Sequence, residues 1–280
     1  MEKELEKLIH EALKEDGYDK DVTSLSIIEP KREGIGNFIV KSSGVVSGTL
    51  ICKEVFRQIS PKIKFNILKR DGEYVHKGDV IASISGRMVD IIRGERVALN
   101  FLQRMSGIAT ITDKYVEELK GTNCQILDTR KTTPLLRQFE KDAVIHGKGL
   151  NNRSNLTEQA SVKDYHIAVA GSINSAVERI RTKFGDEIAI EVDVENNEEF
   201  IDAINSDCDV IKLQNMSNEE LSELCSIPHG NKKLVACGNI TINRVRSIAL
   251  LGVDYISIDS LVHSAKALDI NFKFLKKSFK

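Results

Sequence analysis

The sequence predicts an α/β protein whose C-terminal part is a βα barrel or partial barrel, and three observations lead to this class. The chain has 280 residues, which is enough for one large or two ordinary domains. From Cys124 onward, short apolar runs alternate with amphipathic segments, and the last four runs recur at roughly 22-residue spacing, the period of a βα unit. No GxGxxG motif follows any of these runs, so a barrel fits the pattern better than a Rossmann sheet.

The N-terminal part of the chain mixes helix and strand patterns. Apolar residues at helical spacing predict an amphipathic helix within residues 1–17. Strand-like runs follow at residues 37–40 and 64–68. The segment 71–86 alternates apolar and polar residues between glycine turns, which predicts a hairpin.

A helix predicted over residues 93–110, which Gly107 ends or bends, links this region to a more regular one. Strands and helices then alternate, which implies a parallel sheet with covering helices. The predicted strands are 124–128, 187–194, 208–214, 232–238 and 253–259, and the predicted helices between the later strands are 197–206, 218–225 and 241–252.

Polar residues stand at the ends of the predicted strands. In a βα barrel these carboxyl ends converge on one face, where active sites form. Glu191 and Asp193 are two residues apart and therefore share one strand face. Any single member could instead cap the following helix, but convergence on a ligand explains the set better. The set comprises Asp128 with Arg130, Glu191 with Asp193, Gln214 with Asn215, Cys237 with Asn239, and Ser257 with Asp259.

Positive charge is concentrated between Asp128 and His166, although the chain as a whole is neutral, with 40 Lys and Arg against 41 Asp and Glu. Such a cluster indicates a pocket for a small polyanion, because arginine can fork onto a carboxylate or phosphate and lysine adds a point charge. The alternative is a solvated helix face, the usual place for a run of charges. The basic residues are Arg130, Lys131, Arg137, Lys141, Lys148, Arg153 and Lys163.

The composition argues against several classes of protein. Tryptophan is absent and tyrosine is sparse, which disfavours a stacking platform for nucleic acid. No apolar run is long enough to cross a bilayer, and the acidic N-terminal helix is unlike a signal peptide. The five cysteines are scattered without a CxxC pair, which disfavours a zinc site or a disulfide framework. We therefore expect a reduced, cytoplasmic protein that binds neither nucleic acid nor membrane.

Five long motifs follow one another in a fixed order along nearly the whole chain. They are EDxxxxDVT at residues 15–23, ERxALNFLQRxSGIAT at 95–110, DTRKTTP at 128–134, GVDxIS at 252–257 and LxHSxxxLD at 261–269. Through these motifs the chain resembles the quinolinate phosphoribosyltransferase family, also called carboxylating nicotinate-nucleotide pyrophosphorylases. Motifs of this length are far more specific than a lone glycine signature.

The resemblance implies two domains and an assembly. The first domain is an α/β sandwich over residues 1–110, against which residues 268–280 pack back. The second is an α/β barrel over residues 111–267, as in type II phosphoribosyltransferases. The implied assembly is a homodimer, or a larger oligomer built from it, in which the helix carrying Arg96 reaches into the neighbour's site.

The resemblance also implies a reaction and its residues. Quinolinate, an aromatic dicarboxylate, is joined to phosphoribosyl pyrophosphate to give nicotinate mononucleotide, pyrophosphate and carbon dioxide, with magnesium, in NAD biosynthesis. By position, the quinolinate-binding cations are Arg96, Arg130, Arg153 and Lys163. The implied catalytic residues are Lys131, Lys163 and Asp193. The further substrate contacts are Asn152, Gln214, Cys237, Gly238, Asp259 and His263.

Several positions depart from the family's pattern, mostly on the sugar and phosphate side. Asn152 stands where a histidine is usual, and Gln214 replaces one of two acidic residues. Because an amide is a poorer ligand for a hard cation than a carboxylate, Asp193 is left as a weak magnesium ligand that acts through water. Cys237 replaces a serine. Asp259 replaces a glycine and would repel a phosphate unless its side chain turns away or a metal intervenes.

Three hypotheses follow from the retained cations and the altered phosphate side. The first is an active quinolinate phosphoribosyltransferase, an enzyme of the pentosyltransferase class. The second is a paralogous transferase that acts on another aromatic or heterocyclic carboxylate. The third is a non-catalytic homologue that binds a carboxylate. We favour the first.

Overall fold

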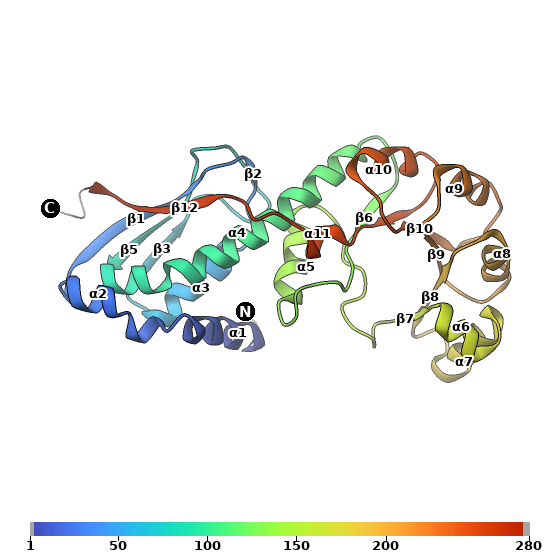
Figure 1. The fold of residues 1–280 in the computed structure, drawn as a ribbon, viewed down its shortest axis with the longest axis horizontal. Coiled ribbons are helices and arrows are strands. Elements are labelled where there is room, and N and C mark those ends of the chain that lie inside the picture. The colour runs from blue at the N-terminus through green and yellow to red at the C-terminus, as the bar shows by residue number, and fades with distance from the viewer. Residues whose placement is uncertain (1–2, 277–280) are drawn as a thin grey trace. The chain divides into compact units, whose positions relative to one another are not determined.

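The computed structural model describes residues 3–276 and divides the chain into two compact units (Figure 1). The first unit contains the chain up to Ile111, the segment Thr133–Lys148 and the segment from Ala265 onward. The second contains Thr112–Thr132 and Gly149–Ser264. The chain therefore leaves the first unit and returns to it twice.

The first unit is built on a four-stranded antiparallel sheet. Its strands lie in the order β12 (Ile270–Phe274), β1 (Glu33–Val40), β5 (Val80–Arg87) and β3 (Lys64–Ile67). A separate two-stranded sheet pairs β2 (Gly44–Val45) with β4 (Tyr74–Val75). Phe272 on β12 lies opposite Phe38 on β1, so a strand near the C-terminus completes the N-terminal sheet. Residues 277–280 of the segment expected to pack back lie outside the described residues.

Helices and aromatic side chains form the core of this unit. Phe38 is fully buried, and its ring centroid lies 6.1 Å from that of Phe56 and 5.2 Å from that of Phe272. Burying each such side chain contributes about 1.5–3 kcal/mol. The helices are α1 (Lys3–Glu15), α2 (Val22–Ile27), α3 (Thr49–Ile59), α4 (Met88–Glu118) and α5 (Arg137–His146), with a short 3-10 turn η1 (Tyr18–Lys20). The residues of α4 from Thr112 onward belong to the second unit.

One expectation for this part of the chain is wrong, and one of the two alternatives given for Gly107 is excluded. Residues 71–86 do not form a hairpin, because β4 pairs with β2 whereas β5 pairs with β1 and β3. Gly107 does not end its helix, since α4 continues to Glu118. A Cβ atom at Gly107 would lie 2.3 Å from the carbonyl oxygen of Lys266, so the glycine is needed for the close approach of that segment.

Helix α5 groups with the first unit, which differs from the expected boundary at residue 110. The buried carboxylate of Glu140 on α5 accepts a hydrogen bond from Arg104 Nη2 at 2.7 Å and one from Thr133 Oγ1 at 2.8 Å. Because Arg104 belongs to α4, these bonds attach the segment 133–148 to that helix.

The second unit contains a six-stranded parallel sheet with covering helices (Figure 1). The strand order is β6 (Gln125–Leu127), β11 (Tyr255–Ser257), β10 (Lys233–Cys237), β9 (Val210–Gln214), β8 (Ala189–Val194) and β7 (Gln159–Val162). The helices are α6 (Asp164–Ala170), α7 (Ile173–Phe184), α8 (Asn197–Asn205), α9 (Asn218–Cys225), α10 (Ile242–Ala249) and α11 (Ser260–His263). Among residues 3–276, no helix combines the length and the apolar character needed to span a bilayer.

The alternation of side chains along β8 explains the two faces of this sheet. Ile190 and Val192 are fully buried, as expected on the face that helices cover. Glu191 and Asp193 point to the opposite face, because successive side chains of a strand alternate. The strand order begins at β6 and ends at β7, so the parallel sheet of the described residues is open and not a closed barrel. The predicted α/β fold class is thereby confirmed.

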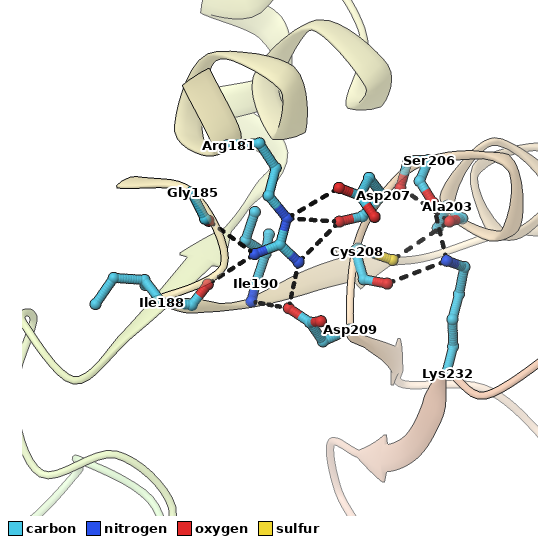
Figure 2. A network of polar contacts seen from close by, with 10 residues as sticks. All are labelled: Arg181, Gly185, Ile188, Ile190, Ala203, Ser206, Asp207, Cys208, Asp209 and Lys232. Carbon is cyan, nitrogen blue, oxygen red and sulfur yellow. Dashed lines mark hydrogen bonds and ion pairs between the residues drawn. The ribbon is translucent and has the colours of Figure 1, made fainter. Parts of the chain in front are cut away.

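Arg181, near the end of α7, ties the chain before β8 to the chain before β9 (Figure 2). Its guanidinium donates to the carbonyl oxygens of Gly185 at 3.2 Å and Ile188 at 3.0 Å, and to Asp209 Oδ2 at 2.7 Å. The same Asp209 oxygen accepts the Ile190 N–H at 2.7 Å. This network therefore holds the amino ends of two central strands in place, away from the strand ends where a site is expected.

Replacing Arg181 by alanine is expected to lower the free energy of unfolding by about 2–4 kcal/mol, because it removes several charge-assisted hydrogen bonds and leaves carbonyl groups unsatisfied. Urea unfolding followed by circular dichroism measures this. Arg179→Ala is the matched control, since Arg179 lies on the same helix and its side chain donates one exposed bond among residues 3–276, to Ala170 O. We expect a loss below about 0.5 kcal/mol for the control, and equal losses in the two variants would contradict the role of the network.

Candidate active site

A cavity of about 440 Å³ opens at the carboxyl ends of the strands in the second unit. This is the end at which active sites of α/β barrels form. The fold brings nine of the predicted site residues together around it. They are Arg130, Lys131, Asn152, Arg153, Lys163, Gln214, Cys237, Gly238 and Asp259.

Asp193 is the centre of a hydrogen-bonded cluster beside this cavity. Its Oδ2 atom accepts from Lys163 Nζ and from Gln214 Nε2, each at 2.8 Å. Its Oδ1 atom is buried and has no hydrogen-bond partner among the described residues. Gln214 thus serves as a donor that holds Asp193, which a carboxylate at that position could not do.

Asp259 forms an ion pair within the cavity. Its Oδ2 atom lies 2.7 Å from Lys131 Nζ. The lysine is largely exposed, so the pair contributes little to stability. Its consequence is electrostatic: an anion that enters this side of the cavity meets a neutralised aspartate instead of a free negative charge.

Arg130 and Arg153 lie close enough for their positive charges to repel each other. Burial lowers the pKa of Arg153, and the charge of Arg130 lowers it further. Arg153 Nη1 donates to the carbonyl oxygen of Gln159 at 2.8 Å, which fixes the direction of the guanidinium. Two neighbouring arginines that line one cavity favour a ligand with carboxylate or phosphate groups.

Asn152 supports the backbone next to Arg153. Its N–H donates to Asp128 Oδ1 at 2.8 Å, and its side-chain oxygen accepts the Arg153 N–H at 2.7 Å. Asn152 also lines the cavity, so it can both position Arg153 and meet a ligand.

The loop after β10 is shaped by close contacts with the loop after β9. Gly238 has φ 88°, and a Cβ atom there would lie 2.0 Å from Asn215 Oδ1. The N–H of Asn215 donates to Cys237 O at 2.9 Å, and Asn215 and Asn239 also have positive φ, at 54° and 49°. Burial raises the pKa of the Cys237 thiol to about 12, so it faces the cavity as a neutral group.

Besides Asp193, which lies beside this cavity, two further predicted residues do not line it. His263 lines an adjacent hollow, which shares Gly238, Asn239, Ser257 and Asp259 with the first. Arg96 is exposed on α4 in the first unit. The catalytic and binding roles of all the site residues stay predictions.

Sequence reasoning missed Lys212 and Ser161, which line the same cavity. Lys212 could have been predicted from the sequence, because it stands two residues before Gln214 and therefore shares its strand face. Lys212 Nζ lies 3.3 Å from Glu191 Oε1, and Ser161 Oγ lies 3.3 Å from the same oxygen. Glu191 is one of the predicted strand-end acids, and Lys212 and Ser161 are its two partners in the structure.

The donor atoms around Asp193 are too few for a magnesium ion held by the protein alone. Magnesium prefers octahedral coordination by oxygen. Asp193 offers one free carboxylate oxygen, its other oxygen is engaged by an ammonium and an amide, and Gln214 presents its donor side to it. Within residues 3–276, no group of three His, Cys, Asp or Glu side chains is arranged to hold a metal.

A parallel α/β sheet whose strand ends surround a cavity rich in arginine and lysine defines a protein that acts on small anionic molecules. The family models for the N-terminal and C-terminal domains of quinolinate phosphoribosyl transferase match residues 21–106 and 108–273. The chain therefore belongs to the quinolinate phosphoribosyltransferase family, and the resemblance is confirmed.

Relatives and solved structures agree with this family. The chain is 38% identical to a probable carboxylating nicotinate-nucleotide pyrophosphorylase of Bacillus subtilis, over 96% of this chain and 92% of that protein. The crystal structure of a nicotinate-nucleotide pyrophosphorylase from Ehrlichia chaffeensis has a TM-score of 0.92 and 37% identity, covering 96% and 98% of the two chains. That of NadC from Streptococcus pyogenes has a TM-score of 0.91 and 34% identity, covering 96% of each chain. Nothing in the comparisons favours the other two hypotheses.

Proposed function

We propose that this protein transfers the phosphoribosyl group of phosphoribosyl pyrophosphate to quinolinate, with loss of carbon dioxide, to form nicotinate mononucleotide for NAD biosynthesis. The observation that carries the proposal is the repelling pair Arg130 and Arg153 on the wall of a cavity that also contains Lys131 and Lys163. A bound dianion relieves that repulsion.

The charges of the cavity suit the demands of the reaction. The ring nitrogen of quinolinate attacks the anomeric carbon of the sugar, and the bond to pyrophosphate breaks with its electron pair leaving on that group. The departing charge needs cations, which Lys131 supplies at the open side of the cavity. The carboxylate next to the ring nitrogen then leaves as carbon dioxide, and the electron pair left on the ring carbon takes up a proton. Arginines that hold the acid in a partly desolvated site favour the loss of carbon dioxide.

The decisive assay incubates the purified protein with quinolinate and phosphoribosyl pyrophosphate and follows nicotinate mononucleotide by chromatography and mass spectrometry. Release of labelled carbon dioxide from quinolinate carrying the label in its 2-carboxylate provides a second readout. We expect equal amounts of both products. Absence of turnover at high protein concentration, with magnesium and with manganese, would overturn the proposal.

Magnesium enters this proposal as a partner of the pyrophosphate group and not as an ion held by the protein. The sparse donor set around Asp193 supports this, and the predicted water-mediated contact of Asp193 remains compatible with it. Removal of divalent cations with EDTA is therefore expected to leave the affinity for quinolinate within about twofold, as measured by calorimetry. A tenfold loss of acid affinity in EDTA would show that the acid site itself needs the metal.

We also propose a homodimer in which Arg96 of one subunit completes the site of the other, and a cytoplasmic location. The exposure of Arg96 on α4 is compatible with such a contact. Mixing an Arg96→Ala variant with an Arg153→Met variant tests the dimer, because subunit exchange rebuilds one intact site in each mixed dimer. Recovery of activity in the mixture is expected, and two inactive variants that stay inactive after verified exchange would contradict it.

A further inference from the structure

Lys212 is a cation of the cavity that the sequence motifs do not assign. It lies on β9 directly opposite Asp193 of β8 in the parallel ladder. It stands two residues before the carboxyl end of the strand, which places it about 7 Å deeper than Gln214. Its side chain is 14% exposed, against 35% for Lys163 and 66% for Lys131. Lys212 is therefore the lysine at the floor of the cavity.

The contact between Lys212 and Glu191 is long for a buried ion pair. Charge-assisted N–H···O bonds measure about 2.7–2.9 Å. Lys212 Nζ lies 3.3 Å from Glu191 Oε1, whereas the Lys131 and Lys163 pairs measure 2.7 and 2.8 Å. An ammonium group has three donors. For the Lys212 side chain, this is the single hydrogen bond found among the described residues, so donors remain for a ligand.

The ammonium group of Lys212 keeps its charge in this position. Burial by itself would lower the pKa of Lys212, but the charge and hydrogen bond of Glu191, together with the nearby Cys237 and Asp193, outweigh burial and the pKa is raised. A largely buried, protonated lysine whose one hydrogen bond is long is a costly arrangement unless something else binds it.

The charge count of the cavity leaves room for a dianion. Five cationic side chains line it, Lys212 included, and three carboxylates accompany them: Glu191, Asp259 and the adjoining Asp193. The positive charges therefore exceed the negative charges by two. A small, flat aromatic dicarboxylate matches both the excess of two positive charges and the depth of the floor. The bulkier phosphoribosyl pyrophosphate, with its phosphate groups, suits the open side near Lys131.

We infer that Lys212 is a substrate-binding residue that receives one carboxylate of the aromatic acid at the floor of the cavity, while Arg130 and Arg153 hold the other. Glu191 holds the ammonium group in place until the acid arrives. This inference rests on the proposed function and adds to it a residue that selects dicarboxylic over monocarboxylic acids. Ser161, which shares the Glu191 oxygen, offers a hydroxyl to the same carboxylate.

Four proteins test this inference: the wild type, Lys212→Met, Glu191→Gln, and the double variant Lys212→Met/Glu191→Gln. Calorimetry measures the affinity of each for quinolinate, for pyridine-3-carboxylate and for phosphoribosyl pyrophosphate. Lys212→Met is expected to weaken quinolinate binding about 10- to 100-fold, as for loss of a charged hydrogen bond, and to change the other two affinities less than about threefold. Glu191→Gln is expected to tighten quinolinate binding, because it releases the ammonium group.

The double variant distinguishes the loss of the Lys212 contact from an effect on folding and from an effect on the net charge of the cavity. It leaves no buried charge without a partner, and it restores the excess of two positive charges, yet it lacks the ammonium group. Quinolinate binding as weak as in Lys212→Met supports the inference. Recovery of wild-type affinity would overturn it, as would a Lys212→Met variant that binds quinolinate normally or loses only the phosphoribosyl donor.

The same titrations distinguish this inference from the proposed reaction. A wild type that binds quinolinate through Lys212 but forms no nucleotide would leave the inference standing and remove the transferase proposal. A wild type that forms nicotinate mononucleotide, together with a Lys212→Met variant of unchanged affinity for quinolinate, would support the transferase proposal and remove the inference about Lys212.

Discussion

Replacing Arg153 by methionine is expected to weaken the binding of quinolinate about 100-fold, or about 2.8 kcal/mol, while the ligand-free protein stays as stable as the wild type. The guanidinium group is partly buried and is repelled by Arg130, so its positive charge is unfavourable until an anion binds. Its removal costs the bond to Gln159 O but also ends that repulsion. These opposite effects leave the free energy of unfolding within about 1 kcal/mol of the wild type.

Calorimetry with quinolinate and urea unfolding of the ligand-free protein measure the two halves of this expectation. Arg179→Met is the matched control, because Arg179 is an arginine of the same unit that makes an exposed bond outside this cavity. The control should bind quinolinate like the wild type. An Arg153→Met variant with unchanged acid affinity, or one that unfolds far more easily, would show that Arg153 is a structural residue.

Replacing Gly238 by alanine is expected to abolish product formation and to lower the free energy of unfolding by about 3 kcal/mol or more. The residue has φ 88°, which side chains other than that of glycine rarely adopt. The added methyl group would also lie 2.0 Å from Asn215 Oδ1 and 3.0 Å from Asn215 N. Asn215 must therefore move, and its bond to Cys237 O is lost together with the shape of the cavity.

Gly252→Ala provides the control for the contribution of backbone strain. Gly252 has φ 101°, but a Cβ atom there meets nothing within 4 Å. This variant should lose about 1 kcal/mol of stability and keep its activity. The difference between the two variants, measured by urea unfolding and by the nucleotide assay, isolates the contact with Asn215. Equal losses in both would contradict a special role for the loop after β10.

The regular C-terminal part was predictable because its signals are local. The apolar runs at 208–214 and 232–238 contain β9 and β10, and the helix predicted at 218–225 coincides with α9. The hairpin predicted for residues 71–86 is wrong for the opposite reason, because the pairing of strands is not a local property. The alternation in this segment indicated strands correctly, but the partner of β4 lies at Gly44–Val45, far back in the chain, and alternation carries no information about distant partners.

In the candidate site, too, local signals were predictable and contacts between distant residues were not. Arg130, Arg153 and Lys163 could be assigned from motifs and from the concentration of charge, and all three line the cavity. The pairing of Asp259 with Lys131 could not be read from the sequence, because 128 positions separate the two residues. Without that pairing, Asp259 was expected to repel a phosphate.

The sequence by itself determined the α/β class, the family and the set of cations that gather at the strand ends, since periodicity, motif order and charge are properties of the chain. The tertiary structure alone decided which acids those cations neutralise. It also decided that Gln214 holds Asp193 as a donor and that Lys212 forms the floor of the cavity. The physical reason is that hydrogen bonds and ion pairs depend on distances of a few ångströms between residues far apart in the chain, and only the folded sheet sets those distances.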